Sequence, residues 1–522
     1  MVLERNESVQ QKLLEFEATR RRQKAELGVF EPALVSSASR EANNRQNTVE
    51  QQRSTLSDTF NERNNIYDEG LESLVPSGAR IRLGYNLRDL RNNLQNQASF
   101  ASLGATNGEY QSFLGLSISQ PLLKNAWFPA TRAGIRIAAL SSKGAFQEYR
   151  RQLMNIMSIT EASYWNLYLA QEQVRFYQES VKTAARVLTD SKTRFEAGKG
   201  SSLEELEAEA GLALRRSKLS EAQQKLNEAV SRLTSLYAWS TSSGEPPIEA
   251  VDAPEIGPEM LPASRFAQAA LELNPDYLAQ RQKLDQERIR LGYARNQRLP
   301  ELNLKGSYGL NGLGDSAGSS WTDTRSADWP SWTIGIELRI PLGGDIKARN
   351  LLSAAKLEVK SGELALHDLQ IQIVNGLDTA WHKIRSSREG VESYRTSVKF
   401  NQSLLDAALI QFLAGKVDCR KVLEIEADLL EAKASMVEAL VQYRRSVLEF
   451  ELVEGGLLKR RGLDLTQQNL ANATQYFVQA SNPGSKSGYQ DSMRYLINAY
   501  RINQVFNRLP TPLPYAQGLP NE

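Results

Sequence analysis

The chain carries the same helical hairpin twice, and this duplication limits its fold more than any other feature of the sequence. The first copy reads FEAGK from Phe195 and LEAEA from Leu206. The second copy reads FLAGK from Phe412 and LEIEA from Leu423. The offset between the two motifs is the same in both copies, which indicates that a whole folded unit was duplicated.

A second pair of landmarks extends the duplication to the start of each half. Residues 6–34 align without a gap on residues 274–302, and each is a polar helical stretch that a proline stops. We therefore assign a first repeat to residues 1–240 and a second to residues 263–461. A Pro/Ser-rich linker at 241–262 separates them.

Alternating segments lie between the first helix and the hairpin of each half. Apolar and polar residues alternate with a period of two over about 79–92 and 109–121, and again over about 301–311 and 331–341. Two settings give this pattern. One is a soluble sheet with one face on a core, and the other is a membrane barrel with lipid outside and water inside. Strands of about 9 to 11 residues suit a tilted crossing of a bilayer.

Two long helical hairpins follow, over residues 127–238 and 346–458. Their first arms, at 130–195 and 347–412, contain no proline, and each could form a nearly continuous helix of about 65 residues, roughly 100 Å long. The chain has 24% charged residues and a mean hydropathy of −0.45. No apolar run approaches the length of a membrane helix, so the arms are expected to be water-exposed coiled coils.

The strand count predicts an oligomer. Four convincing strands per chain are too few to close a barrel, because the smallest filled barrel takes about eight. Open strand edges are not tolerated in hydrocarbon. Several identical chains must therefore pool their strands. The fold class is mainly α with membrane β, in which long hairpins form a helical tube and the strands enter a shared oligomeric barrel.

Two regions are less defined. Residues 33–75 form a polar insert that could be an additional hairpin with a turn at residues 76–78, and each chain would then bring six strands instead of four. Residues 462–522 form a tail with a helix around 488–507. We expect the tail to wrap the outside of the tube near its waist, or to be disordered.

No enzymatic or nucleic-acid site is expected. The two histidines, His367 and His382, lie inside a predicted helix and lack metal-ligand spacing. The single Cys419 has no activating histidine nearby, and the glycines of 309–318 do not open a helix as a phosphate loop does. The 63 basic and 61 acidic residues leave a net charge of +2, and no basic face concentrates this excess. The alternative to a membrane protein is a soluble or peripheral coiled-coil scaffold with a small β-sheet.

These landmarks together resemble the TolC-like outer membrane efflux proteins over about residues 6–465. The strand-to-helix junctions at 119–123 and 339–344 and the glycine-containing hairpin tips carry the likeness. The stretch 28–32 also looks like a subgroup with a longer insert in the first half.

The resemblance implies a homotrimer that forms a 12-stranded outer membrane barrel joined to a periplasmic α-helical tunnel. Such a protein is the passive exit duct of a tripartite efflux or type I secretion system. It docks through its hairpin tips to a periplasmic adaptor (membrane fusion) protein and an inner membrane pump. No catalysis and no cofactor are implied, and the pump selects the cargo, so the sequence does not identify it.

The resemblance also implies an entrance gate at the tips, where acidic residues follow the tip glycines. Glu204 and Glu207 stand six and nine residues beyond Gly198, and Glu424 stands nine beyond Gly415. Lys421 departs from the pattern and would attract Glu204 or Glu424 instead of repelling them. The structural alternative is that the acidic residues favour the first turn of the return helix through its dipole.

Two further groups of residues are candidates. Tip residues would contact the adaptor: Phe195, Ala197, Gly198, Phe412, Ala414 and Gly415. Charged residues on the polar faces of the strands would line the barrel lumen, because an Arg or Lys facing lipid would cost about 2 to 4 kcal/mol: Arg80, Arg82, Arg88, Lys305, Glu337 and Arg339.

An exported protein should begin with a basic and then apolar signal, yet the sequence, which begins MVLERN, becomes polar almost at once. Three explanations are possible for the missing signal: it was removed, the start was assigned too late in the chain, or the protein is cytoplasmic. The outer membrane, with the helical body in the periplasm, is the expected location.

Overall fold

The computed structural model describes residues 2–55, 57–93, 108–198, 200–236, 248–463 and 466–470. The chain divides into two compact units. The helical unit comprises Met1–Ala18, Lys143–Arg281 and Ala365–Glu522. The sheet unit comprises Thr19–Ser142 and Gln282–Leu364.

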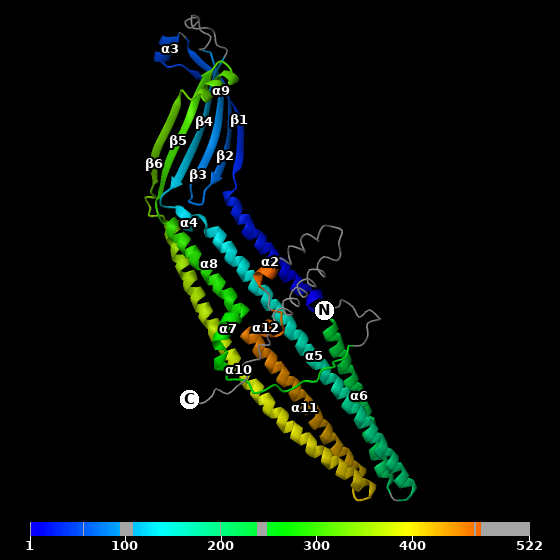
Figure 1. Ribbon diagram of the computed structural model, residues 1–522. Helices are drawn as coiled ribbons and strands as arrows, with labels where there is room; N and C mark the ends of the chain where they lie inside the picture. Colours follow the sequence, from blue (N-terminus) through cyan, green and yellow to red (C-terminus); the bar gives the residue numbers. More distant parts are fainter. Residues whose placement is uncertain are drawn as a thin grey trace, which may run out of the picture. The chain divides into compact units, whose positions relative to one another are not determined.

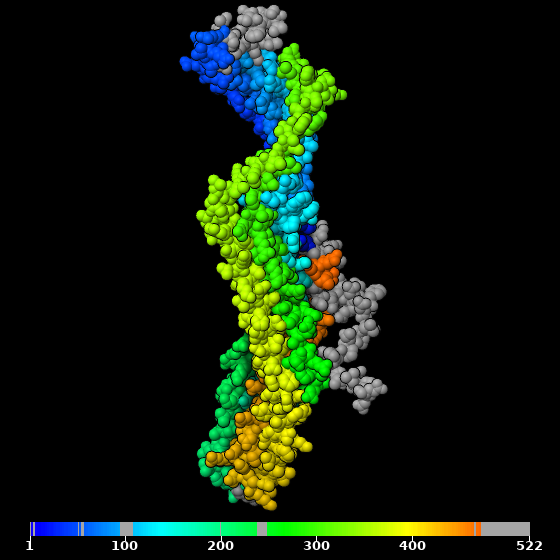
Figure 2. Space-filling view, turned by 90° about the vertical axis from the view of Figure 1, so that its left-hand side faces the viewer, coloured from blue at the N-terminus to red at the C-terminus, as the bar shows by residue number. Residues whose placement is uncertain are grey.

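The longest helices of the described chain form two helical hairpins (Figure 1). In the first, α5 (Ala133–Glu196) is followed by α6 (Ser202–Thr234), and in the second, α10 (Ile346–Leu413) is followed by α11 (Cys419–Glu454). Helices α5 and α10 have 64 and 68 residues, which corresponds to roughly 100 Å each. This confirms the predicted long coiled-coil helices. Figure 2 shows α10, in yellow, beside α11, in orange.

The other helices of the described chain are shorter. These are α1 (Val2–Arg5), α2 (Glu7–Ala25), η1 (Glu26–Phe30), α3 (Val49–Thr55), α4 (Trp127–Thr131), η3 (Ala263–Arg265), α7 (Ala267–Leu273), α8 (Pro275–Gln297), α9 (Ala317–Ser326) and α12 (Leu457–Arg460).

The duplication is visible in two asparagines at equivalent positions. The Oδ1 atom of Asn6 accepts hydrogen bonds from the backbone N–H of Ser8 and Val9, and that of Asn274 accepts from Asp276 and Tyr277. Both asparagines therefore cap the helix that follows.

The side-chain amide nitrogens of the two asparagines also donate equivalent hydrogen bonds. Asn6 Nδ2 donates to the carbonyl of Leu236, just past the end of α6, at 3.1 Å. Asn274 Nδ2 donates to the carbonyl of Val453, near the end of α11, at 2.9 Å. Each half thus ties its first helix to the end of its own return helix.

In the described part of the chain, one antiparallel sheet holds six strands in sequence order. They are β1 (Ala33–Gln46), β2 (Thr59–Leu74), β3 (Arg80–Asn92), β4 (Glu109–Pro121), β5 (Glu301–Gly314) and β6 (Pro330–Arg339). The two halves of the sequence meet where β4 pairs with β5.

The insert at 33–75 is therefore an additional β-hairpin, and the alternative of six strands per chain is confirmed over the count of four. The expected turn at 76–78 joins β2 to β3, whereas β1 and β2 are connected through α3. Strand β1 reads ALVSSASREANNRQ and is rich in Ser, Asn, Arg and Glu. Such residues are depleted or neutral in strands, so residue propensities alone do not predict the pair of strands β1 and β2. Pairing of β2 with β3 from Glu62 to Leu74 compensates for the weak propensity.

Part of the predicted linker and most of the predicted tail lie outside the described residues. Within the linker, residues 248–262 are described without helix or strand, and the backbone N–H of Gly257 donates to the Tyr443 hydroxyl at 3.1 Å. The helix predicted around 488–507 lies outside the described residues.

Candidate functional site

The strand register places all six predicted lumen residues on one face of the sheet. Arg80, Arg82 and Arg88 alternate along β3 with Ile81, Leu83 and Leu87. Across the sheet, Arg80 is paired with Ser119 and Ser119 with Lys305, so that Lys305 lies on the same face as Arg80. On β6, Glu337 and Arg339 share this face by the same period of two.

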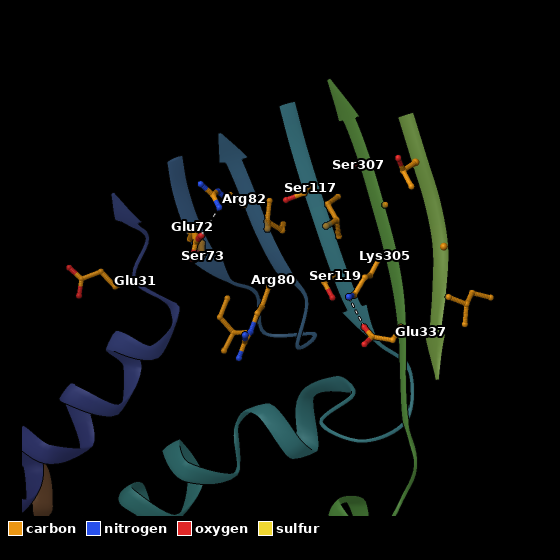
Figure 3. Close-up of a pocket in the computed structure, with 17 residues that line it drawn as sticks. Glu31, Glu72, Ser73, Arg80, Arg82, Ser117, Ser119, Lys305, Ser307 and Glu337 are labelled. Atoms are coloured by element: carbon orange, nitrogen blue, oxygen red, sulfur yellow. Dashed lines mark ion pairs between the residues drawn. The ribbon is translucent and has the colours of Figure 1, made fainter. Parts of the chain in front are cut away.

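This polar face is hollowed. A groove of about 780 Å³ runs across it, lined among others by the labelled charged and hydroxyl side chains of Figure 3. Arg82 pairs with Asp68 at 2.5 Å and with Glu72 at 3.5 Å, and Lys305 pairs with Glu337 at 2.5 Å. Arg339 lies 3.8 Å from Glu301. Arg82, Lys305 and Arg339 thus each have a partner of opposite charge on this face.

The opposite face is apolar and exposed. One row of mutually paired residues crosses all six strands: Leu34, Leu71, Leu83, Leu116, Tyr308 and Trp332. Each of them is at least 40% exposed, and Trp332 reaches 72%. Neighbouring positions on β6 add Ile334 and Ile336, at 67% and 72%. An exposed apolar band of this extent marks a surface that another apolar phase covers.

Helix α9 covers part of this apolar face with small polar groups. Ser320 and Thr324 place their hydroxyls 2.5 Å from the Ser112 hydroxyl of β4, and Trp321 meets Tyr85 edge to face at 5.2 Å. The sequence analysis predicts no helix after the glycines of 309–318, yet α9 begins at Ala317, shortly after β5 ends at Gly314.

Both hairpin tips turn at a glycine in the left-handed region. Gly198 has φ of +69° and Gly415 has φ of +71°. Such values favour glycine because other residues pay a steric cost there. At the first tip, the Ser201 side chain accepts from the Leu203 N–H and begins α6.

The predicted tip contacts are not equivalent in the two halves. Phe195 is 44% exposed, whereas Phe412 is 1% exposed in the described chain. Phe412 belongs to a core of all four long helices, and Arg194 both stacks on its ring at 5.0 Å and donates to its carbonyl at 3.2 Å. Ala197, Gly198, Ala414 and Gly415 lie at the surface.

The four predicted gate residues fall into two environments. Lys421 and Glu424 are exposed and form an ion pair at 2.9 Å within the first turns of α11. The pKa of Glu424 is lowered by the hydrogen bond and the charge of Lys421. Of the two attractions expected of Lys421, the one to Glu424 forms within the single chain.

Glu204 and Glu207 are half-buried beside Cys419. The Cys419 thiol donates to the Glu204 carbonyl at 3.3 Å and lies 3.9 Å from Glu207 Oε2. Burial, with the two carboxylates, raises the pKa of Cys419. The thiol is therefore protonated at neutral pH and contributes packing and a weak hydrogen bond.

A buried ion pair behind the gate residues was missed by sequence reasoning. Arg215 of α6 is 8% exposed and Glu426 of α11 is 5% exposed, and Arg215 Nε donates to Glu426 Oε2 at 2.8 Å. A second Arg215 nitrogen donates to the Leu423 carbonyl at 2.7 Å. No sequence signal identifies the pair, because Glu426 aligns with the exposed Glu209 of the first copy, which pairs with Lys192.

Among the described helices, none combines the length and the apolar character needed to cross a bilayer.

The family model for outer membrane efflux proteins matches this chain twice, over residues 80–238 and 266–456. The paired match corresponds to the duplication read from the sequence.

Two curated proteins and one solved structure place the chain among its relatives. It is 23% identical over 388 residues to the alkaline protease secretion protein AprF of Pseudomonas aeruginosa, covering 72% of this chain and 75% of AprF. It is 27% identical over 294 residues to the cobalt-zinc-cadmium resistance protein CzcC of Cupriavidus metallidurans, covering 56% of this chain and 66% of CzcC.

The fold matches that of the Campylobacter jejuni CmeC outer membrane channel, with a TM-score of 0.60 and 15% identity. That likeness covers 91% of this chain and 87% of CmeC. A duplicated helical hairpin unit, a two-faced sheet and a family model matched in both halves lead to one assignment: the chain belongs to the outer membrane efflux protein family.

Proposed function

We propose that this protein is the exit duct of a tripartite export system, assembled as a homotrimer and gated at its hairpin tips. The strands of the trimer form the outer membrane barrel, and the long hairpins form the periplasmic tunnel. The tips dock to a periplasmic adaptor, which connects the duct to an inner membrane pump. The duct itself performs no chemistry, and the pump supplies the energy.

The two-faced sheet carries this proposal. Its apolar row is exposed on all six strands and suits acyl chains, and its opposite face holds paired charges around a groove. Water in the lumen solvates those charges, whereas lipid would not. A single sheet with two open edges cannot remain so in hydrocarbon, so copies of the chain must complete the wall.

The gate proposal rests on the acidic residues that follow the tips. Glu204 and Glu207 lie in the first turns of α6, and Glu424 lies in those of α11. In a trimer, each charge is repeated three times around the entrance, which strengthens its action on passing ions. Lys421 offsets Glu424 through their ion pair, so net repulsion at the entrance is weaker than four carboxylates per chain would give.

The relatives are named for different cargoes, a protease and metal ions. We infer that the cargo is chosen by the partner pump and not by this duct.

The experiment measures both the oligomeric state and the ion conductance of the purified protein. The protein purified from outer membranes is expected to have three times the chain mass and to conduct ions in planar bilayers with a preference for cations. The double variant Glu204→Gln/Glu207→Gln should lower that preference. The control Glu221→Gln/Glu228→Gln removes two carboxylates from the same helix, farther from the turn, and should leave it unchanged. A monomeric protein that does not conduct contradicts the proposal.

A further inference from the structure

The first two strands lie outside the part of the chain that the family model matches. That match begins at residue 80, which is the first residue of β3. Strands β1 and β2 nevertheless extend the same sheet, with β2 paired to β3 from Glu62↔Asn92 to Leu74↔Arg80. The family-matched part of the sheet is thus β3 to β6, and this chain adds a hairpin to its β3 edge (Figure 1).

A row of glycines shows that β2 is built into the same wall. Gly70, Gly84, Gly115 and Gly309 are successive partners on the polar face of β2, β3, β4 and β5. Glycines at paired positions let strands bend and let large side chains lie flat on the sheet.

Two side chains use this space. A Cβ on Gly70 would lie 2.9 Å from Arg82 Nε, and one on Gly115 would lie 2.5 Å from the Phe113 ring, which also covers Gly309. The guanidinium of Arg82 therefore lies across the boundary between β2 and β3. It holds Asp68 and Glu72 of β2 there by its ion pairs.

The outer face of the added hairpin continues the apolar row through Leu34 and Leu71, and Tyr67 follows on β2. On this face Glu69 lies between Tyr67 and Leu71, and Arg63 of β2 and Arg40 of β1 lie farther along the strands, away from the apolar row. Glutamate on a lipid face costs less than Arg or Lys, for which the cost is about 2 to 4 kcal/mol at the midplane and falls towards the interfaces. The hairpin thus fits the edge of a bilayer wall.

We propose that β1 and β6 are the intermolecular edges, so that β6 of one copy pairs with β1 of the next and three copies close an 18-stranded barrel. Six strands alternate in direction within the sheet, so β6 and the neighbouring β1 meet antiparallel, as barrel closure requires. This inference rests on the homotrimer of the proposed function.

The consequence is a wider pore. Barrel diameter grows roughly linearly with strand number, so 18 strands give about 1.5 times the diameter of a 12-stranded barrel. Barrels of about 16 to 18 strands enclose an open aqueous channel. The exit of this duct is thus suited to bulkier cargo than a 12-stranded barrel passes.

Disulfide crosslinking between copies tests the edges. In a Cys419→Ser background, one set of variants combines Gly335→Cys on β6 with Val35→Cys, Ser37→Cys or Ser39→Cys on β1. The competing set combines Gly335→Cys with Arg82→Cys, Asn86→Cys or Arg88→Cys on β3. All these positions face the groove side. The three β1 positions cover about 13 Å of strand and the three β3 positions about 20 Å, so different registers between the copies are sampled.

Covalent dimers and trimers are expected in the first set after mild oxidation, and none in the second. Crosslinks in the second set would mean that β3 is the edge and that the hairpin is excluded from the wall. Absence of crosslinks in both sets also overturns the proposal. The mass of the wild-type oligomer is read separately: a monomer contradicts the proposed function, whereas a trimer with β3–β6 crosslinks contradicts only the wider barrel.

Discussion

Arg215 and Glu426 form a buried ion pair that connects the return helices of the two hairpins. Arg215 lies on α6 and Glu426 on α11, and Arg215 also donates to the Leu423 carbonyl. Both side chains sit beside the core shared by the four long helices. The two copies of the duplicated unit are thus joined by a contact that the copies do not share.

Removing one partner of this pair should be costly. Arg215→Ala leaves Glu426 buried and unpaired, and the expected loss is about 3 to 5 kcal/mol of stability. Lys383→Ala is the matched control, because Lys383 pairs with Glu449 at 2.7 Å between α10 and α11 while both are 45% exposed. It should cost at most about 1 kcal/mol.

The measurement is the thermal midpoint of the purified protein in detergent. The double variant Arg215→Met/Glu426→Leu should recover most of the loss, because no unpaired charge remains. Equal shifts for Arg215→Ala and Lys383→Ala would show that burial of the pair does not matter.

Replacing Lys421 with an acidic residue should make the entrance more selective for cations. Lys421→Glu removes the ion pair with Glu424 and adds a carboxylate, so each copy changes by two charges. Reversal potentials across a planar bilayer measure the effect. Lys218→Glu is the control, because Lys218 forms the same kind of exposed pair, at 2.9 Å with Glu221, farther along α6. An unchanged reversal potential for Lys421→Glu would place the residue away from the ion path.

The pH dependence of selectivity should report the same pair. Lys421 lowers the pKa of Glu424, so the ion pair contributes above the ordinary carboxyl pKa of about 4.3 and is lost as pH falls through the lowered value. In Lys421→Met, Glu424 should take up its proton at higher pH than in the wild type.

A titration of the reversal potential between about pH 3 and 6 measures the midpoint. It should move upwards in Lys421→Met and remain in place in Lys218→Met. A downward shift in Lys421→Met would contradict the assignment.

The sequence predicts those parts of the fold that depend on local patterns. Strands β3 to β6 alternate cleanly, and the tip glycines mark left-handed turns, so both could be located from residue type. Strand β1 could not, since its Ser and Asn residues suit loops and it becomes a strand only by pairing with β2. Arg215 and Glu426 lie 211 positions apart, and only the packing of the hairpins brings them together.

Replacement of glycine by valine is expected to have different effects on stability at two sites on the polar face of the sheet, one inside the glycine row and one outside it. Gly115→Val places a side chain where the Phe113 ring lies, and such overpacking costs about 1 to 3 kcal/mol. A Cβ on Gly335 of β6 meets no described atom of its own chain within 4 Å, so Gly335→Val should be neutral or stabilising by up to about 1 kcal/mol, because valine favours strands.

The temperature at which the folded barrel unfolds on a denaturing gel measures both variants. If the Phe113 ring causes the loss, Gly115→Val/Phe113→Ala should recover part of it, because the smaller side chain vacates the space above the glycines. A similar loss for Gly115→Val and Gly335→Val, without recovery in the double variant, would mean that backbone flexibility is what the row provides. In that case residue 115 would be glycine for its backbone flexibility and not to make room for the Phe113 ring.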